Sequence, residues 1–151
     1  MAGLVVSPFA VIGLRLYTKV TRRPRVRVLV TNEKDEVLLL RGVIAKGRRW
    51  SLPGGGVNRR ESLPAAAQRE LYEETGIDVA TSKLRHLRTV PRAELNLPFD
   101  APVFHVKVKR ADLPDTPHNP REIAHVAWFR TDDLPKHVSA LALEIIAKYH
   151  T

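Results

Sequence analysis

The 151-residue sequence contains no cysteine, which excludes a disulfide scaffold, a zinc site built on thiolates and a cysteine nucleophile. It also lacks an apolar run long enough to cross a membrane, because the uncharged stretch from Leu4 to Leu14 is short and Arg15 follows it. A secretory signal carries its positive charges before its apolar run, whereas here they come after it. We therefore expect a cytoplasmic protein with no integral membrane segment.

Acidic residues are few relative to basic ones. There are 16 Asp and Glu against 25 Lys and Arg, a formal charge of +9. Such a surface attracts polyanions, namely nucleotides, RNA ends or an anionic membrane, although the same charge can simply aid solubility. The length suits one compact domain, and 44% hydrophobic with 27% charged residues is typical of a globular protein.

Residues 1–24 are predicted to form a helical extension. Apolar residues recur at roughly helical spacing from Val5 to Val20, and Ser7-Pro8 is typical of a helix start. We expect this amphipathic helix to pack on the domain or on a second copy in a homodimer. The alternative is a peripheral membrane contact beside the basic cluster Arg22–Arg27.

Residues 25–151 are predicted to form the main domain. Alternation and turn residues indicate strands at 26–31, 37–40, 84–90, 103–109 and 125–129, the first two forming a hairpin. Helices are expected at 62–75, capped by Ser62 and Gly76, and at 139–149. Loops are expected at 41–49, 53–56, 95–102 and 112–120. A helix within a run of strands indicates an α+β fold with helices on a mixed sheet.

Three carboxylates crowd one face of the first of these helices, because Glu70, Glu73 and Glu74 lie within one turn. Such a cluster is tolerated when it is solvated, paired with Arg69 or bound to a cation, and Mg²⁺ prefers carboxylate oxygens. Upstream, Gly54–Gly56 forms a turn whose backbone can approach a phosphate closely. A solvated acidic face is the alternative interpretation of the carboxylates alone.

Taken together, residues 55–77 resemble the Nudix box. The matching positions are Gly55, Glu61, Arg69, Glu70, Glu73, Glu74 and Gly76, with Leu71 and Ile77 in the apolar positions. The surroundings are also similar to that family, with Trp50 and Pro53 before the box and Glu122 and Trp128-Phe129 after it. The resemblance implies an α/β/α sandwich containing the box helix and a C-terminal helix.

The resemblance further implies a hydrolase that cleaves a nucleoside diphosphate linked to another group, with Mg²⁺ or Mn²⁺ as cofactor. It makes Glu70 and Glu74 the principal metal ligands, with Glu73 and the Gly54 carbonyl as further ones. Arg69 is expected to orient carboxylates, and Glu61 to support the box helix. Such a metal screens the phosphates and lowers the pKa of bound water.

The general base and the substrate stay open at this stage. Glu122 is the best base candidate outside the box, with Glu73 or Glu70 as box alternatives and Asp112, Asp115, His118 and His125 as weaker ones. Arg41, Arg49, Trp50 and Gly55 are the candidate substrate contacts, although Trp50 equally suits core packing. ADP-ribose, nucleoside triphosphates and dinucleoside polyphosphates are the candidate substrates. The alternatives are removal of pyrophosphate from RNA 5′ ends and a non-catalytic module that binds nucleotide or RNA.

Overall fold

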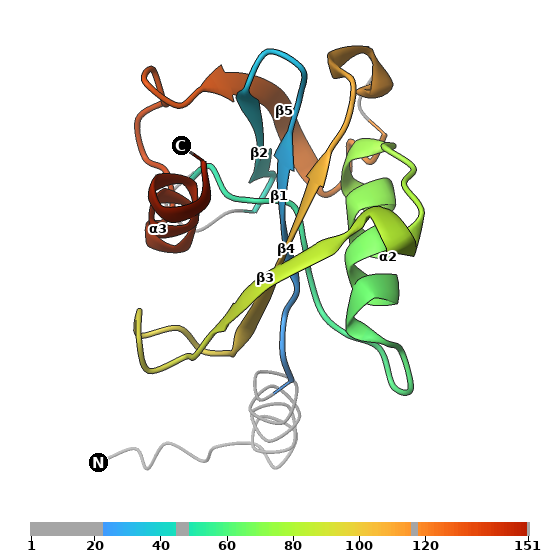
Figure 1. Ribbon diagram of the computed structural model, residues 1–151, viewed down its shortest axis with the longest axis vertical. Coiled ribbons are helices and arrows are strands. Elements are labelled where there is room, and N and C mark those ends of the chain that lie inside the picture. Colours follow the sequence, from blue (N-terminus) through green and yellow to red (C-terminus); the bar gives the residue numbers. More distant parts are fainter. Residues whose placement is uncertain (1–22, 45–48, 116–117, 151) are drawn as a thin grey trace, which may run out of the picture.

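The computed structural model of the chain describes residues 23–44, 49–115 and 118–150 (Figure 1). The predicted N-terminal helix lies outside these residues, so its packing stays a prediction. The rest forms a mixed sheet with one long helix on each side (Figure 1). This arrangement confirms the α+β class and the α/β/α sandwich.

Five strands make up the sheet: β1 (Arg27–Thr31), β2 (Glu36–Gly42), β3 (Arg85–Val90), β4 (Ala101–Lys107) and β5 (Ile123–Arg130). Their spatial order is β3-β4-β1-β2-β5, with β1 parallel to β4 and the other neighbours antiparallel. The predicted β1–β2 hairpin is present. Its turn is closed by Asn32, whose Oδ1 accepts hydrogen bonds from the backbone N–H groups of Lys34 and Glu36.

Three strands begin earlier than predicted, β2 at Glu36, β4 at Ala101 and β5 at Ile123, and β2 continues to Gly42, inside the expected loop 41–49. β4 starts at Ala101, within the expected loop 95–102, and Pro102 pairs with Thr89 of β3. The proline is tolerated because the pairing of β4 with β1 begins only at Val103. The expectation of a loop through Pro102 was wrong. Proline is excluded from a strand only at positions where the backbone N–H must donate a hydrogen bond to a neighbouring strand.

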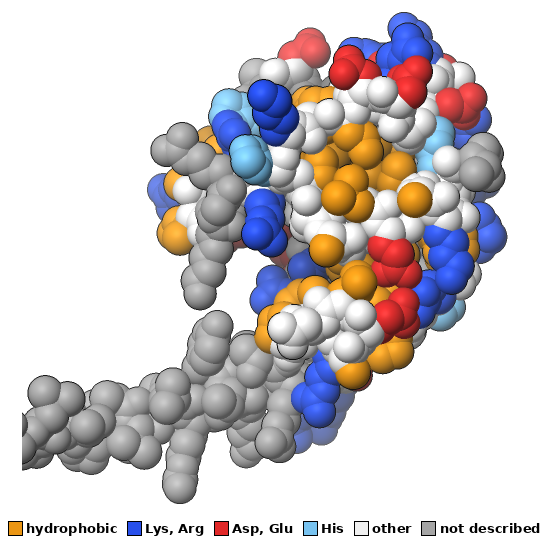
Figure 2. All heavy atoms as spheres, turned by 90° about the vertical axis from the view of Figure 1, so that its left-hand side faces the viewer, with side chains coloured by type: hydrophobic (Ala, Val, Ile, Leu, Met, Phe, Trp, Pro, Cys, Tyr) orange, Lys and Arg blue, Asp and Glu red, His pale blue; other side chains and the backbone are white. Residues whose placement is uncertain are grey.

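The two faces of the sheet pack against different helices. Val28, Val30 and Leu38 face α2 (Leu63–Thr75), whereas Leu29, Val37 and Leu39 face α3 (Ala140–Tyr149). Two short 3₁₀ helices, η2 (Thr81–Lys83) and η3 (Arg110–Asp112), complete the described elements. On the side that α3 covers, hydrophobic side chains gather at the centre with charged side chains around them (Figure 2).

Local sequence sets both ends of α2. Ser62 Oγ accepts a hydrogen bond from the Ala65 N–H at 3.3 Å, Pro64 lies in the first turn, and Gly76 ends the helix with φ of 77°. Glu70, Glu73 and Glu74 therefore lie in the last two turns of α2. No helix within the three described ranges is both long and apolar enough to cross a membrane.

Candidate active site

The glycine loop before α2 runs beside the start of β1. Val28 N–H donates to the Pro53 carbonyl and Val26 N–H to the Gly55 carbonyl, each at 2.9 Å. Gly54, between them, has φ of 146°, and a Cβ atom there would overlap the Val26 carbonyl oxygen. Only glycine fits this position without strain.

The same loop meets the carboxylates of α2. Gly54 N–H donates to Glu74 Oε2 at 2.7 Å, and a Cβ on Gly55 would lie 2.5 Å from the Glu70 carboxylate. A side chain at position 55 would therefore displace the Glu70 carboxylate. The predicted contact of Gly55 with substrate stays a prediction.

Arg69 links the loop to the helix through five hydrogen bonds, the number of N–H groups on a guanidinium. Nε and Nη2 donate to the two carboxylate oxygens of Glu61 at 2.8 and 2.9 Å, and Nη2 also donates to the Gly56 carbonyl at 2.8 Å. Nη1 donates to Glu70 at 2.9 Å and to Glu73 at 3.2 Å. These bonds raise the pKa of Arg69 and lower that of Glu61. The guanidinium thus fixes the orientation of three carboxylates.

Glu74 is the carboxylate whose charge is least well neutralised. Burial, the largest cause, and the nearby Glu70 together raise its pKa to about 8, against the opposing effects of the Gly54 N–H and of Arg27 and Arg25. A cation beside such a partly buried carboxylate stabilises its ionised form.

The described part of the chain gathers no set of three Asp, Glu or His side chains around one metal position. The reason lies in Arg69, which draws Glu73 and Glu70 toward itself. Glu73 is also 51% exposed. Two hard donors nevertheless fit a divalent cation: the half-buried Glu74 carboxylate and the Gly54 carbonyl, which no donor of the described residues reaches.

A cleft of about 340 Å³ opens beside Glu74. Gly54, Glu122 and three arginines line it, together with apolar side chains of β2 and the start of β5. Sequence reasoning named Glu122 and Gly54 but missed the arginines, which are Arg25, Arg27 and Arg121. Arg25 and Arg27 were assigned to a basic cluster beside the N-terminal helix. The overlooked signal is that Arg27 begins β1. The glycine loop lies beside the start of this strand.

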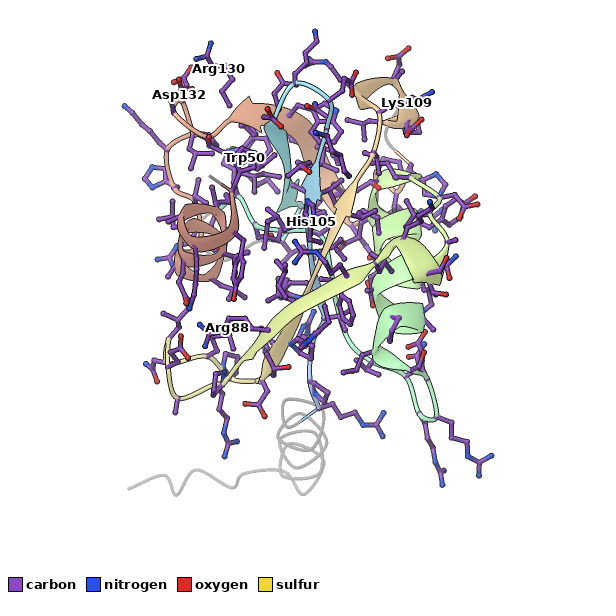
Figure 3. The ribbon with its side chains drawn as sticks, in the orientation of Figure 1. Trp50, Arg88, His105, Lys109, Arg130 and Asp132 are labelled. Carbon is purple, nitrogen blue, oxygen red and sulfur yellow. The ribbon has the colours of Figure 1, made fainter. Side chains whose placement is uncertain are left out.

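Arg41 and Trp50 lie together, away from this cleft. The Arg41 guanidinium lies 5.4 Å from the centre of the Trp50 ring, which packs edge-on against Phe129 at 4.9 Å. Trp50 belongs to the hydrophobic cluster on the α3 side of the sheet (Figure 3). The cleft is lined instead by the adjacent Leu40 and Gly42 of β2. Arg49 is exposed.

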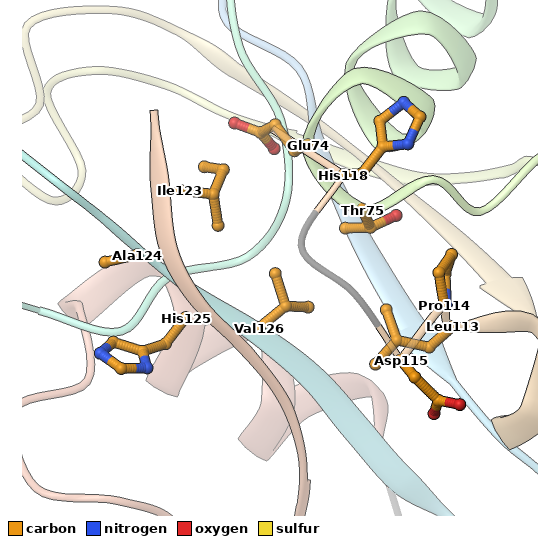
Figure 4. A pocket seen from close by; sticks show the side chains of 10 residues that line it. All are labelled: Glu74, Thr75, Leu113, Pro114, Asp115, His118, Ile123, Ala124, His125 and Val126. Carbon is orange, nitrogen blue, oxygen red and sulfur yellow. The ribbon is translucent and has the colours of Figure 1, made fainter. Parts of the chain in front are cut away.

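The weaker base candidates have different surroundings. Asp115 and His118 line a cavity of about 80 Å³ with Glu74 (Figure 4), and the His118 ring packs edge-on against Tyr72 at 4.8 Å. His125 lines the same cavity, with its ring pointing away from Glu74 (Figure 4). Asp112 caps η3 by accepting a hydrogen bond from the Lys109 N–H at 2.8 Å, which accounts for it structurally.

The NUDIX domain model matches residues 21–149 of the chain. Among curated proteins, an m7GpppN-mRNA hydrolase of Caenorhabditis elegans is 33% identical over 111 residues, or 72% of this chain and 13% of that protein. An RNA pyrophosphohydrolase of Ruthia magnifica is 34% identical over 88 residues, or 58% of this chain and 45% of that protein. The chain therefore spans less than half the length of these two relatives.

Solved structures show the same fold. A MutT NUDIX hydrolase from Burkholderia pseudomallei superposes with a TM-score of 0.70 at 24% identity, covering 85% of this chain and 98% of that one. A bifunctional NMN adenylyltransferase/ADP ribose pyrophosphatase from Francisella tularensis, complexed with AMP and a Mn ion, gives a TM-score of 0.66 at 21% identity. It covers 92% of this chain and 45% of that one.

Proposed function

The chain belongs to the Nudix hydrolase family, and on that premise we propose that it is a Mg²⁺-dependent pyrophosphohydrolase of nucleoside diphosphate derivatives. The observation that carries the proposal is the contact between the glycine loop and the C-terminal turn of α2. There a half-buried carboxylate of raised pKa, Glu74, lies against the Gly54 backbone at the edge of a cleft lined by arginines. The site thus combines the donors that a hard cation prefers with cationic groups suited to phosphates.

Glu74, Glu70 and the Gly54 carbonyl would hold the metal, with Mn²⁺ as a possible substitute for Mg²⁺. When bound, the ion neutralises phosphate charge and makes bound water more acidic. Arg69 and Glu61 keep Glu70 oriented through the hydrogen bonds described above. Glu73, held by the same guanidinium, is assigned a supporting role through water.

Glu122 is the residue we assign as general base. It lines the same cleft as Glu74, and its backbone carbonyl accepts a hydrogen bond from the Val43 N–H at 2.8 Å. That bond anchors the residue at the cleft wall while the side chain remains exposed. A carboxylate there can accept the proton of a water that attacks a phosphorus atom.

ADP-ribose, nucleoside triphosphates and dinucleoside polyphosphates are the proposed small-molecule substrates. RNA 5′ ends are the second candidate, favoured by the +9 charge and by the similarity to proteins named RNA pyrophosphohydrolase. The intact Glu70, Glu73 and Glu74 argue against a module that only binds.

The test is release of phosphate or mononucleotide from a panel of these compounds and 5′-triphosphate RNA, each with Mg²⁺ and with EDTA. We expect Mg²⁺-dependent turnover of at least one compound by the wild type and at least a hundredfold less by Glu74→Gln. No turnover of any compound would contradict the proposal. For RNA, log K against log[salt] should fall with a slope of about −0.7 per single-strand phosphate contact, and a flat response would remove RNA from the list.

A further inference from the structure

Two arginines of the cleft share one aromatic ring. The Arg25 and Arg27 guanidiniums lie 5.4 and 5.2 Å from the centre of the Phe99 ring. A backbone hydrogen bond of 3.0 Å from Arg25 N–H to the Asp100 carbonyl brings the Phe99 loop against the start of β1. Phe99 therefore lies against both positive charges.

Four arginines of the described residues make ion pairs. Arg69, Arg88, Arg110 and Arg130 each contact at least one carboxylate. No ion pair among the described residues includes Arg25 or Arg27. Asp100, the residue after Phe99, accepts a hydrogen bond from the Arg92 N–H.

The local electrostatics are unfavourable without an anion. The side-chain hydrogen bond of Arg27 goes to the neutral Val26 carbonyl, at 2.9 Å. Burial and the neighbouring Arg25 lower the pKa of Arg27 to about 10. Glu74 and Glu70 oppose this lowering without forming an ion pair with Arg27. The two close guanidiniums at the cleft therefore keep N–H groups that a phosphate group can accept from.

We propose that Arg25 and Arg27, held in position by Phe99, form the cleft's binding site for a substrate phosphate group. The inference rests on the proposed function, since it assigns the residues that bind the substrate's phosphates in the same cleft. Arg27 shares the cleft wall with Gly54 and Glu74, so a phosphate on Arg27 lies beside the carboxylates of α2. Phe99 is a positioning residue that acts through the two arginines.

The test is direct binding of ADP and inorganic pyrophosphate, measured by calorimetry in EDTA so that neither metal nor turnover is needed. Arg27→Met should weaken binding at least about tenfold, and Arg25→Met combined with Arg27→Met at least about a hundredfold. Arg59→Met is the matched control, because Arg59 is an exposed arginine outside the cleft. It should leave the affinity within about twofold.

Phe99 is tested by a conservative pair of variants. Phe99→Leu removes the aromatic face and should weaken ADP binding several-fold, whereas Phe99→Tyr retains the face and should restore wild-type affinity. Thermal melting of both variants identifies a loss that comes only from unfolding. Equal losses in Leu and Tyr variants that melt like the wild type would refute the positioning role.

The outcomes separate this inference from the proposed function. If no compound is hydrolysed but Arg27→Met still abolishes ADP binding, the phosphate site stands and the activity is wrong. If substrates are hydrolysed but Arg27→Met leaves both KM and ADP affinity unchanged, the activity stands and the phosphate site is wrong. Wild-type protein that binds neither probe at millimolar concentration, or an Arg59→Met loss equal to that of Arg27→Met, also overturns the site.

Discussion

Glu74→Gln should stabilise the metal-free protein at alkaline pH while it abolishes activity. The pKa of Glu74 is raised from an ordinary 4.5 to about 8, so the folded protein binds a proton there that the unfolded chain releases. The free energy of unfolding therefore falls as pH rises from about 4.5 to about 8. Since one pH unit corresponds to ~1.4 kcal/mol per proton, the penalty at pH 8 is on the order of 4 kcal/mol.

Glutamine keeps the shape of the side chain and an oxygen that can accept the Gly54 N–H, but it carries no charge. For a domain of this size 1 kcal/mol corresponds to ~2–4 °C in Tm. We therefore expect Glu74→Gln in EDTA to melt about 8–16 °C above the wild type at pH 8 and close to it at pH 5. Calorimetric or fluorescence melting at both pH values measures the difference.

Two comparisons make the result specific. Glu73→Gln removes a charge from an exposed carboxylate on the same helix and should give no stabilisation at pH 8. Mg²⁺ added to the wild type at pH 8 should recover much of the same stability, and the Gln variant should respond little. An equal shift at pH 5 and pH 8, or a Glu74→Gln variant that melts lower at pH 8, would refute the reasoning.

Three further substitutions test other parts of the site. Glu122→Gln should lower kcat by ~10²–10⁴-fold with KM and the Mg²⁺ requirement unchanged, and a rate restored by excess Mg²⁺ would make Glu122 a metal ligand instead. Arg69→Lys cannot make five hydrogen bonds, so kcat should fall at least about tenfold, and normal activity would contradict its orienting role. Gly54→Ala should lower the free energy of unfolding by about 3 kcal/mol in denaturant melts, because the backbone angle and the Val26 carbonyl both exclude a side chain.

The features that were predictable from sequence depend on residues close together in the chain. Ser62 and Gly76 set the ends of α2 through bonds that span three and four residues, so their residue types were sufficient. The helical spacing of Glu70, Glu73 and Glu74 followed for the same reason. The hairpin was recognisable because Asn32 closes a turn within its own few residues.

The features that were missed depend on contacts between distant segments. Arg27 reaches the cleft because β1 lies beside the glycine loop, and Phe99 reaches Arg27 through a hydrogen bond across 75 positions, from Arg25 to Asp100. Trp50 packs on the α3 side because its neighbour Ser51 bridges to Leu40 of β2 while Trp50 itself bridges to Val138. Composition and local spacing carry no information on which segments become neighbours in this way.

The macrodipole of α2 is unfavourable for the charged side chains at its C-terminal end. Its first turn has no acidic residue and its last turn no basic one, while Glu73 and Glu74 lie at the C-terminal end. The helix macrodipole places partial negative charge at that end, so each ionised carboxylate there costs ~0.3–1 kcal/mol. The last turn is consequently the part of the helix most dependent on a cation for its order. Backbone amides there should exchange with solvent faster than those in the middle of the helix until a cation binds, which makes this turn an intrinsic reporter of metal occupancy.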